Sequence, residues 1–107
     1  MAATLEEFKK IEIRTAKVLD VQEIPGADRL WRLTLDVGSE KKDIVAGVKA
    51  FYTKEALLGK SIAIVHNLEP AVIRGVESRG MLLAAKSDGR LSILTTDQDI
   101  PAGSLVG

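Results

Sequence analysis

The chain has 107 residues, a length that fits one domain able to bury roughly 60–70% of its unfolded surface. Lysine and arginine number 15, as do aspartate and glutamate, so the net charge is zero and total charge gives no argument for nucleic-acid binding. No cysteine is present, which excludes disulfides, thiolate zinc sites and a cysteine nucleophile.

Capping and alternation patterns predict a helical turn and three strands in the first half of the chain. A Thr-x-x-Glu capping box predicts the helical turn over residues 4–8. Alternating and β-branched residues predict a long strand over 11–24, bent or bulged where the alternation changes phase near 16–18. Two further strands, separated by glycine-containing turns, are expected over 31–37 and 42–46.

The second half of the chain predicts a short helix and more strands. Thr53 is a good N-cap for a helix over 54–58. A loop over 67–80 and a hairpin turn over 87–90 separate the apolar runs expected as strands, which cover 61–65, 81–85 and 91–94. The order of three strands, a helix and two strands is that of an OB-fold. We therefore expect an all-β, five-stranded barrel with a short helix between the third and fourth strands, short terminal extensions, and a single domain over residues 1–107.

The chain lacks the residue patterns of an enzyme or a metal centre. His66 is the one histidine, and a metal site needs clustered ligands. Neither a Gly-x-Ser-x-Gly elbow nor a phosphate-binding loop is present. No run approaches the ~20 apolar residues of a membrane span, and residues 1–10 do not resemble a signal peptide. We expect a cytoplasmic protein without catalysis, cofactor, metal or membrane contact.

The loop over 67–80 carries the residue types of a binding surface. Arg74 and Arg79 can bind phosphate, while Asn67 and Ser78 can hydrogen-bond to sugar or base edges. For Asn67, capping of the turn is the alternative and slightly favoured role. Aromatic residues make up only 4% of the chain, and this scarcity of stacking groups favours folded RNA over single strands as the ligand. Packing in the core or at the rim is expected for Trp31.

Residues 67–85, NLEPAVIRGVESRGMLLAA, resemble the signature of the tRNA-binding domain family. That signature is Asn-Leu-Lys-Pro-Arg-Lys, a hydrophobic residue, then Arg-Gly-Val-x-Ser-x-Gly-Met. The segments FKKIEIRTAKVLDV, PGADRLWRLTLDVG and IVAGVKAFYTKEALLGK resemble the rest of the family, so the likeness covers essentially the whole chain. Members include the free-standing bacterial tRNA-binding protein, the C-terminal appendage of many methionyl-tRNA synthetases, and the C-terminal domain of endothelial monocyte-activating polypeptide II.

The resemblance implies an OB-fold that binds the outer corner of folded tRNA by shape and backbone. It also implies that the chain forms a homodimer. The resemblance further implies an aminoacyl-tRNA synthetase as a partner: the dimer would act in trans with a methionyl-tRNA synthetase that lacks its own C-terminal appendage. The RNA-binding residues that it implies, together with supporting cations and the second arginine of the loop, are Asn67, Arg74, Ser78, Met81, Lys17, Arg29, Arg32, Lys49 and Arg79.

The chain departs from the family signature at three positions. Glu69 replaces a lysine, and Ala71 and Val72 replace a basic pair. The loss of three phosphate contacts lowers the salt slope of binding by roughly 2–3. An alternative function is a chaperone-like peptide binder of the same broad family, for which the apolar run 71–73 is suited; another is an adaptor that docks a synthetase without RNA contact. The apolar strand over 91–94 and the apolar C-terminal end support dimerisation.

Overall fold

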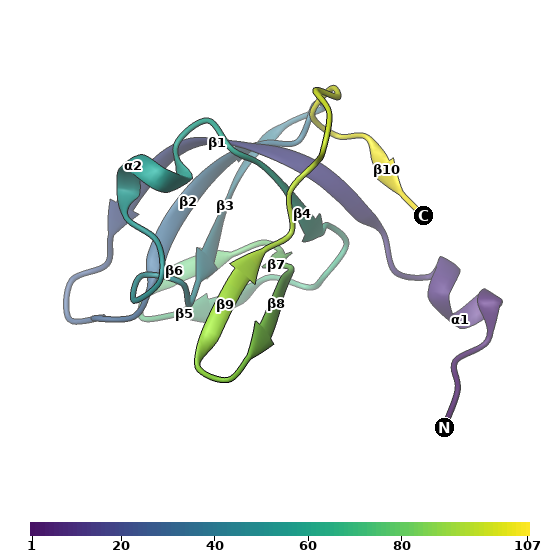
Figure 1. Cartoon of the computed structure of the whole chain (residues 1–107), viewed down its shortest axis with the longest axis horizontal. Helices are drawn as coiled ribbons and strands as arrows, with labels where there is room; N and C mark the ends of the chain where they lie inside the picture. The colour runs from purple at the N-terminus through teal and green to yellow at the C-terminus, as the bar shows by residue number, and fades with distance from the viewer.

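Five antiparallel strands form one curled sheet that wraps around the core (Figure 1). The structure is a computed structural model that describes residues 1–107 throughout. Along the sheet the strand order is β3-β2-β1-β4-β7, with bounds Lys41–Ala46, Trp31–Asp36, Ile13–Glu23, Ser61–Val65 and Met81–Leu82. A further strand, β10 (Leu105–Val106), pairs with the start of β1 at Ile13 and Arg14.

Two short helices flank the sheet. The predicted capping box is present on α1 (Leu5–Lys9), where the Thr4 hydroxyl accepts from the Glu7 amide at 3.1 Å and the Glu7 carboxylate accepts from the Thr4 amide at 2.9 Å. Between β3 and β4 lies α2 (Lys54–Leu57), which Thr53 caps as predicted and which buries Leu57. This arrangement confirms the OB-fold. Neither helix has the length and apolar character needed to cross a membrane.

A β-bulge bends β1 so that one strand serves two parts of the barrel. The register of β1 on β2 shifts between Val18 and Asp20, which leaves Leu19 as the extra residue. The first half of β1 pairs with β4, and the second half pairs with β2. The sequence predicted this irregularity one to three residues earlier.

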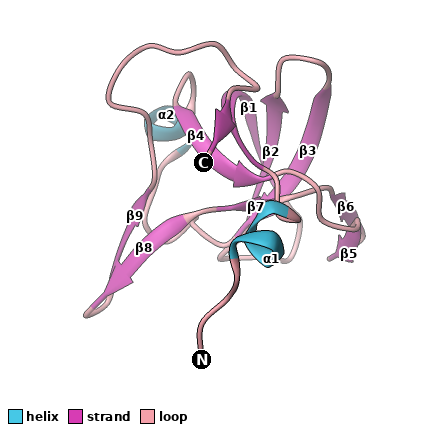
Figure 2. Cartoon of the chain, turned by 90° about the vertical axis from the view of Figure 1, so that its right-hand side faces the viewer, coloured by secondary structure: helices cyan, strands magenta, loops and turns pink.

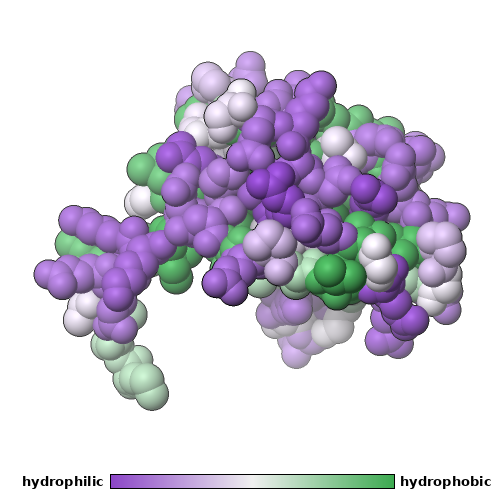
Figure 3. All heavy atoms as spheres, turned by 180° about the vertical axis from the view of Figure 1, so that it is seen from behind, coloured by the Kyte–Doolittle hydropathy of each residue, from purple (hydrophilic) through white to green (hydrophobic).

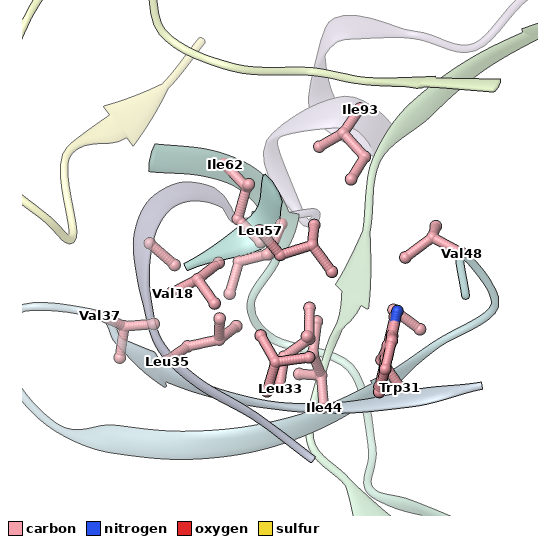
Figure 4. Close-up of a cluster of buried hydrophobic side chains, with 14 residues drawn as sticks. Val18, Trp31, Leu33, Leu35, Val37, Ile44, Val48, Leu57, Ile62 and Ile93 are labelled. Carbon is pink, nitrogen blue, oxygen red and sulfur yellow. The ribbon is translucent and has the colours of Figure 1, made fainter. Parts of the chain in front are cut away.

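The barrel closes where β3 meets the segment that precedes β7. There the Arg79 amide donates to the Asp43 carbonyl at 3.0 Å, and the Val45 amide donates to the Ser78 hydroxyl at 2.9 Å. Inside lies one apolar cluster (Figure 4), which includes Leu33, Leu35, Ile44, Ile62 and Ile64. Trp31 closes one end of this cluster and donates its indole N–H to the Tyr52 carbonyl at 2.9 Å, which confirms its predicted packing role.

The prediction of an irregular loop over 67–80 was wrong. Two short strands, β5 (Ala71–Ile73) and β6 (Val76–Ser78), form a hairpin there. Its two-residue turn is Arg74–Gly75, with φ of 53° and 78°. Positive φ at both turn residues matches the twist of paired strands, so this turn can close a tight hairpin.

The predicted strand over 81–85 is also divided. Only β7 pairs with β4, whereas from Ala84 onward the chain pairs with its own return strand. The result is a second hairpin, β8 (Ala84–Ser87) and β9 (Arg90–Ile93), which projects beyond the sheet (Figure 2). Its turn at Asp88–Gly89 also has positive φ at both residues, as the predicted hairpin turn requires.

Candidate nucleic-acid interface

The β5–β6 hairpin presents Arg74 at its tip. Val76 anchors the hairpin because it packs against a small cluster of Ile24, Ala27 and Val45, which joins the β1–β2 turn to β3. The Arg74 side chain is exposed, and no carboxylate lies within ion-pair distance of it. The hairpin therefore holds an uncompensated positive charge in solvent beside the turn that carries Arg29.

Ser78 supports this hairpin from inside the protein. The Ser78 side chain is only 4% exposed. Its hydroxyl accepts from the Val45 amide at 2.9 Å and donates to the Gly80 carbonyl at 3.3 Å. Both bonds are internal, so the structure gives Ser78 a positioning role at the base of the hairpin.

Asn67 fixes the other end of the same segment. Its carbonyl oxygen accepts from the Glu12 amide at 2.8 Å, and its amide group donates to the Lys10 carbonyl at 2.7 Å. The side chain thus joins the end of β4 to the link between α1 and β1. The two partners lie 55 and 57 residues away in the chain, so Asn67 links two distant segments and does not cap its own turn.

Three of the predicted cations already have acidic partners within ion-pair distance. The closest N–O distances are 2.6 Å from Arg32 to Asp43, 3.2 Å from Lys49 to Glu23, and 3.3 Å from Arg79 to Glu40. Such surface pairs contribute only about 0–1 kcal/mol, so a phosphate can compete for the cation. Lys17, Arg29 and Arg74 have no such partner.

Four of these cations lie in two groups of two. Arg32 and Arg79 line one hollow of about 290 Å³ on the outer face of β2 and β3. Arg29 and Lys49 are joined through their backbones, since the Lys49 amide donates to the Arg29 carbonyl at 3.3 Å. Seen from behind Figure 1, the molecule has a mainly hydrophilic surface with limited apolar patches (Figure 3).

Lys17 and Met81 lie apart from these two groups. Lys17 on β1 is the backbone register partner of Asp36 on β2. Asp36 lies four residues along β2 from Arg32, which separates Lys17 from Arg32 by about 13 Å along the strand. Met81, on β7, is 49% exposed and lines a hollow with Val45.

Sequence reasoning missed a buried lysine beneath this surface. Lys42 is 6% exposed and donates from Nζ to the His66 carbonyl at 2.9 Å. Burial lowers its pKa, while the charge of Glu40 opposes that change. Burial and then the charge of Lys42 lower the pKa of His66, whose buried Nδ1 has no hydrogen-bond partner. The two-residue spacing of Lys42 and Ile44 on β3, which places both on the inward face, was the signal that could have found this residue.

This chain combines an OB-type barrel with exposed cations on a hairpin and its neighbouring turns, and these features are typical of a small binding module. No group of three or more His, Asp or Glu side chains is placed to hold a metal ion. Residues 13–105 match the family model described as a putative tRNA binding domain. This chain therefore belongs to the tRNA-binding domain family.

Known sequences and structures agree with this assignment. The chain is 48% identical over 105 residues to the methionine–tRNA ligase of Thermotoga maritima, and 44% identical over 103 residues to that of Caldanaerobacter subterraneus subsp. tengcongensis. These alignments cover 98% and 96% of this chain but 17% and 16% of the ligases, so the chain spans about a sixth of their length.

Two solved structures have the same fold along their whole length. The MetRS-related protein from Pyrococcus horikoshii superposes with a TM-score of 0.95 at 30% identity, covering 100% of this chain and 99% of that one. The chaperone CsaA from Bacillus anthracis superposes with a TM-score of 0.91 at 26% identity, covering 100% of both chains.

Proposed function

We propose that this chain is a non-catalytic module that binds folded tRNA in the cytoplasm through the β5–β6 hairpin and the cations around it. The observation that carries the proposal is the unpaired charge of Arg74, held at the tip of a hairpin whose base is buried. A fixed cation in solvent binds phosphate without first breaking an internal ion pair. Recognition through backbone and shape needs few stacking aromatics, in keeping with this composition.

The nine predicted site residues take different parts in this proposal. Arg74 and Arg29 contact phosphate directly, with Lys17 and Met81 at the edges of the surface. Asn67 and Ser78 position the hairpin by their internal hydrogen bonds. The remaining cations contact RNA after exchange of their carboxylate partners, and these are Arg32, Lys49 and Arg79.

A salt titration of tRNA binding tests this function. Arg74→Asn removes the charge but keeps a residue that tolerates positive φ, so the hairpin turn is preserved. We expect weaker filter binding of total tRNA and a salt slope reduced by about 1. Lys60→Ala, which removes a cation that has no ion pair, is the matched control. Equal binding of tRNA and random duplex DNA, or no binding at low salt, contradicts the proposal.

The proposal includes a homodimer formed on the side of the molecule that carries α1 and β10. In Figure 1, α1 and β10 lie on the same side of the molecule. α1 buries none of its residues, and Leu105 is 66% exposed although it pairs with β1. Leu5 and Phe8 of α1 add exposed apolar surface at this end. A second copy could cover these side chains.

Sedimentation tests the dimer, and a binding assay tests the synthetase partner. We expect a dimer at micromolar concentration and a monomer for Leu105→Asp, with Leu58→Asp, an exposed apolar site after α2, as the control. A monomeric wild-type chain rules out the dimer. The likeness to methionine–tRNA ligases supports action in trans, and we expect capture of a methionyl-tRNA synthetase that lacks this domain.

Peptide binding is the second candidate function. Val72 of the hairpin is 74% exposed and Leu68 is 45% exposed, and a structural neighbour is described as a chaperone. Suppression of the aggregation of an unfolded client, lost in Val72→Ser and retained in Arg74→Asn, would favour this function over tRNA binding.

A further inference from the structure

A groove separates the loop after β3 from the β8–β9 hairpin. Its volume is about 520 Å³, within the range of small-ligand sites. Phe51 lines the loop side, while Lys86, Arg90 and Leu91 line the hairpin side. None of these four residues belongs to the surface already described.

Phe51 is exposed because the next residue, Tyr52, is the one that packs against the core. The Tyr52 hydroxyl accepts from the Ile93 amide at 3.0 Å, and the Tyr52 carbonyl accepts from the Trp31 indole. Tyr52 thereby ties the loop to the core. Phe51 is 48% exposed and is not part of the apolar core, so its ring is free to contact a ligand.

Two cations face the groove without acidic partners. Lys86 and Arg90 form no ion pair. Asp88, in the hairpin turn, is the one acidic residue lining the adjoining part of the groove, which leaves a net positive lining. An aromatic ring beside two free cations matches the parts of a nucleotide: a flat base and a phosphate.

The groove continues toward the predicted RNA surface. A second hollow of about 300 Å³ is lined by Met81 and also by Lys86 and Leu91. Lys86 and Leu91 therefore border both hollows. A strand of RNA that contacts Met81 can reach Phe51 along this path.

We propose that the groove binds an unpaired nucleotide of RNA, with its base against Phe51 and its phosphate between Lys86 and Arg90. This site rests on the proposed tRNA-binding function and extends it: the hairpin cations bind backbone, while the groove holds one base of an unpaired segment. A peptide would use the ring and Leu91 but has no regular anion for the two cations, so the lining favours RNA.

Anisotropy of a fluorescent oligouridylate of about eight nucleotides tests the groove apart from the tRNA surface. We expect Phe51→Ala to weaken its binding about 5- to 150-fold, the range of one base–aromatic stack. Phe51→Tyr keeps the ring and should bind as the wild type does. Leu58→Ala, which also shortens an exposed apolar side chain, is the matched control. The double variant Lys86→Ala, Arg90→Ala should lower the salt slope by about 1–2.

A covalent readout identifies the contacting residue directly. Oligouridylate carrying 5-iodouridine should crosslink to Phe51 under ultraviolet light, and mass spectrometry identifies the modified residue. Crosslinking elsewhere, or equal binding by Phe51→Ala and Leu58→Ala, overturns the proposed groove. The proposal is also overturned if Phe51→Ala loses binding of a peptide from an unfolded client protein but still binds oligouridylate, because the occupant of the groove is then a peptide.

The two proposals fail separately. If tRNA binding depends on Arg74 while Phe51→Ala binds both RNAs normally, the groove is wrong and the proposed function stands. If oligouridylate binds through Phe51 while the wild-type chain does not prefer tRNA to random duplex DNA, the groove stands and the proposed function is wrong.

Discussion

The hydroxyl of Ser78 accepts a hydrogen bond from the backbone amide of Val45 at 2.9 Å. This bond lies at the seam of the barrel, where a neighbouring strand would ordinarily supply a backbone carbonyl. A side chain therefore completes the edge of β3 and joins it to the β5–β6 hairpin. The serine of the family signature has an architectural reason in this chain, apart from any contact with RNA.

Ser78→Ala is expected to lower the free energy of unfolding by about 1–3 kcal/mol, because the Val45 amide loses its partner in a buried site. Urea denaturation followed by circular dichroism measures this change. Ser92→Ala on the exposed face of β9 is the control and should be nearly neutral. Equal stability of the two variants would show that water replaces the hydroxyl at the seam.

Gly38 and Gly103 meet where the C-terminal segment crosses the β2–β3 turn. Both have φ of +86°, and a Cβ on Gly103 would lie 2.3 Å from the Val37 carbonyl oxygen. Gly103→Ala should therefore cost about 1–3 kcal/mol from the backbone alone and also displace the segment that leads to β10.

A matched glycine separates these two effects. Gly26 has φ of +78°, but a Cβ there would meet nothing within 4 Å. Gly26→Ala thus carries the conformational cost without the clash. We expect faster C-terminal proteolysis and a lower melting temperature for Gly103→Ala than for Gly26→Ala. Indistinguishable variants would mean that the crossing has room for a methyl group.

The strands and helices with strong local patterns were predictable from the sequence. The strict alternation in β2 and the Thr N-caps of both helices depend on interactions between residues close in sequence, and the structure confirms all of them. The β5–β6 hairpin was missed because its turn is Arg74–Gly75, and arginine rarely adopts positive φ. β10 was missed because distant contacts hold it, such as the bond from the Gly103 amide to the Thr15 carbonyl at 2.8 Å.

The candidate site was predictable in its residue types but not in their surroundings. A sequence shows Arg32 and Arg79 as cations, whereas only the fold brings Asp43 and Glu40 to them. In the same way, the groove beside Phe51 depends on a hairpin that approaches from the other end of the chain. Pairing and exposure are properties of the folded chain, and they decide which charges are free.

Stability should fall as the pH drops through the range of the single histidine. Burial is the main cause that lowers the pKa of His66 in the fold, followed by the charge of Lys42, with Glu12 and Glu40 opposing. Between this lowered pKa and the ordinary value near 6.5, the unfolded chain binds a proton that the folded chain does not, so stability rises with pH there. Acidification from pH 7.5 should therefore lower the melting temperature.

The variant His66→Gln tests that titration. It removes the group, so its melting temperature should change less with pH over the same interval. Carboxylates contribute to both proteins below the histidine range and cancel in the comparison. Parallel pH profiles for the wild type and His66→Gln would show that the imidazole does not titrate differently on folding.

Restoring the missing family cations should strengthen tRNA binding, but unequally. Glu69→Lys reverses a charge at an exposed position next to the hairpin, and we expect the salt slope to steepen by about 1. Val72→Lys should gain less, because Val72 lies opposite Glu77 in the hairpin register and the new lysine gains a cross-strand partner. Adding Glu77→Gln should release that lysine.

Filter binding of total tRNA across salt distinguishes this order from simple charge counting. The expected ranking of affinity is Glu69→Lys above Val72→Lys, with the double variant Val72→Lys, Glu77→Gln above Val72→Lys alone. Gln98→Lys, at an exposed position after β9 that lines neither the β5–β6 surface nor the groove beside Phe51, adds a positive charge and serves as the control. If Gln98→Lys strengthens binding as much as Glu69→Lys, net charge alone governs affinity and the β5–β6 hairpin is not the site of contact.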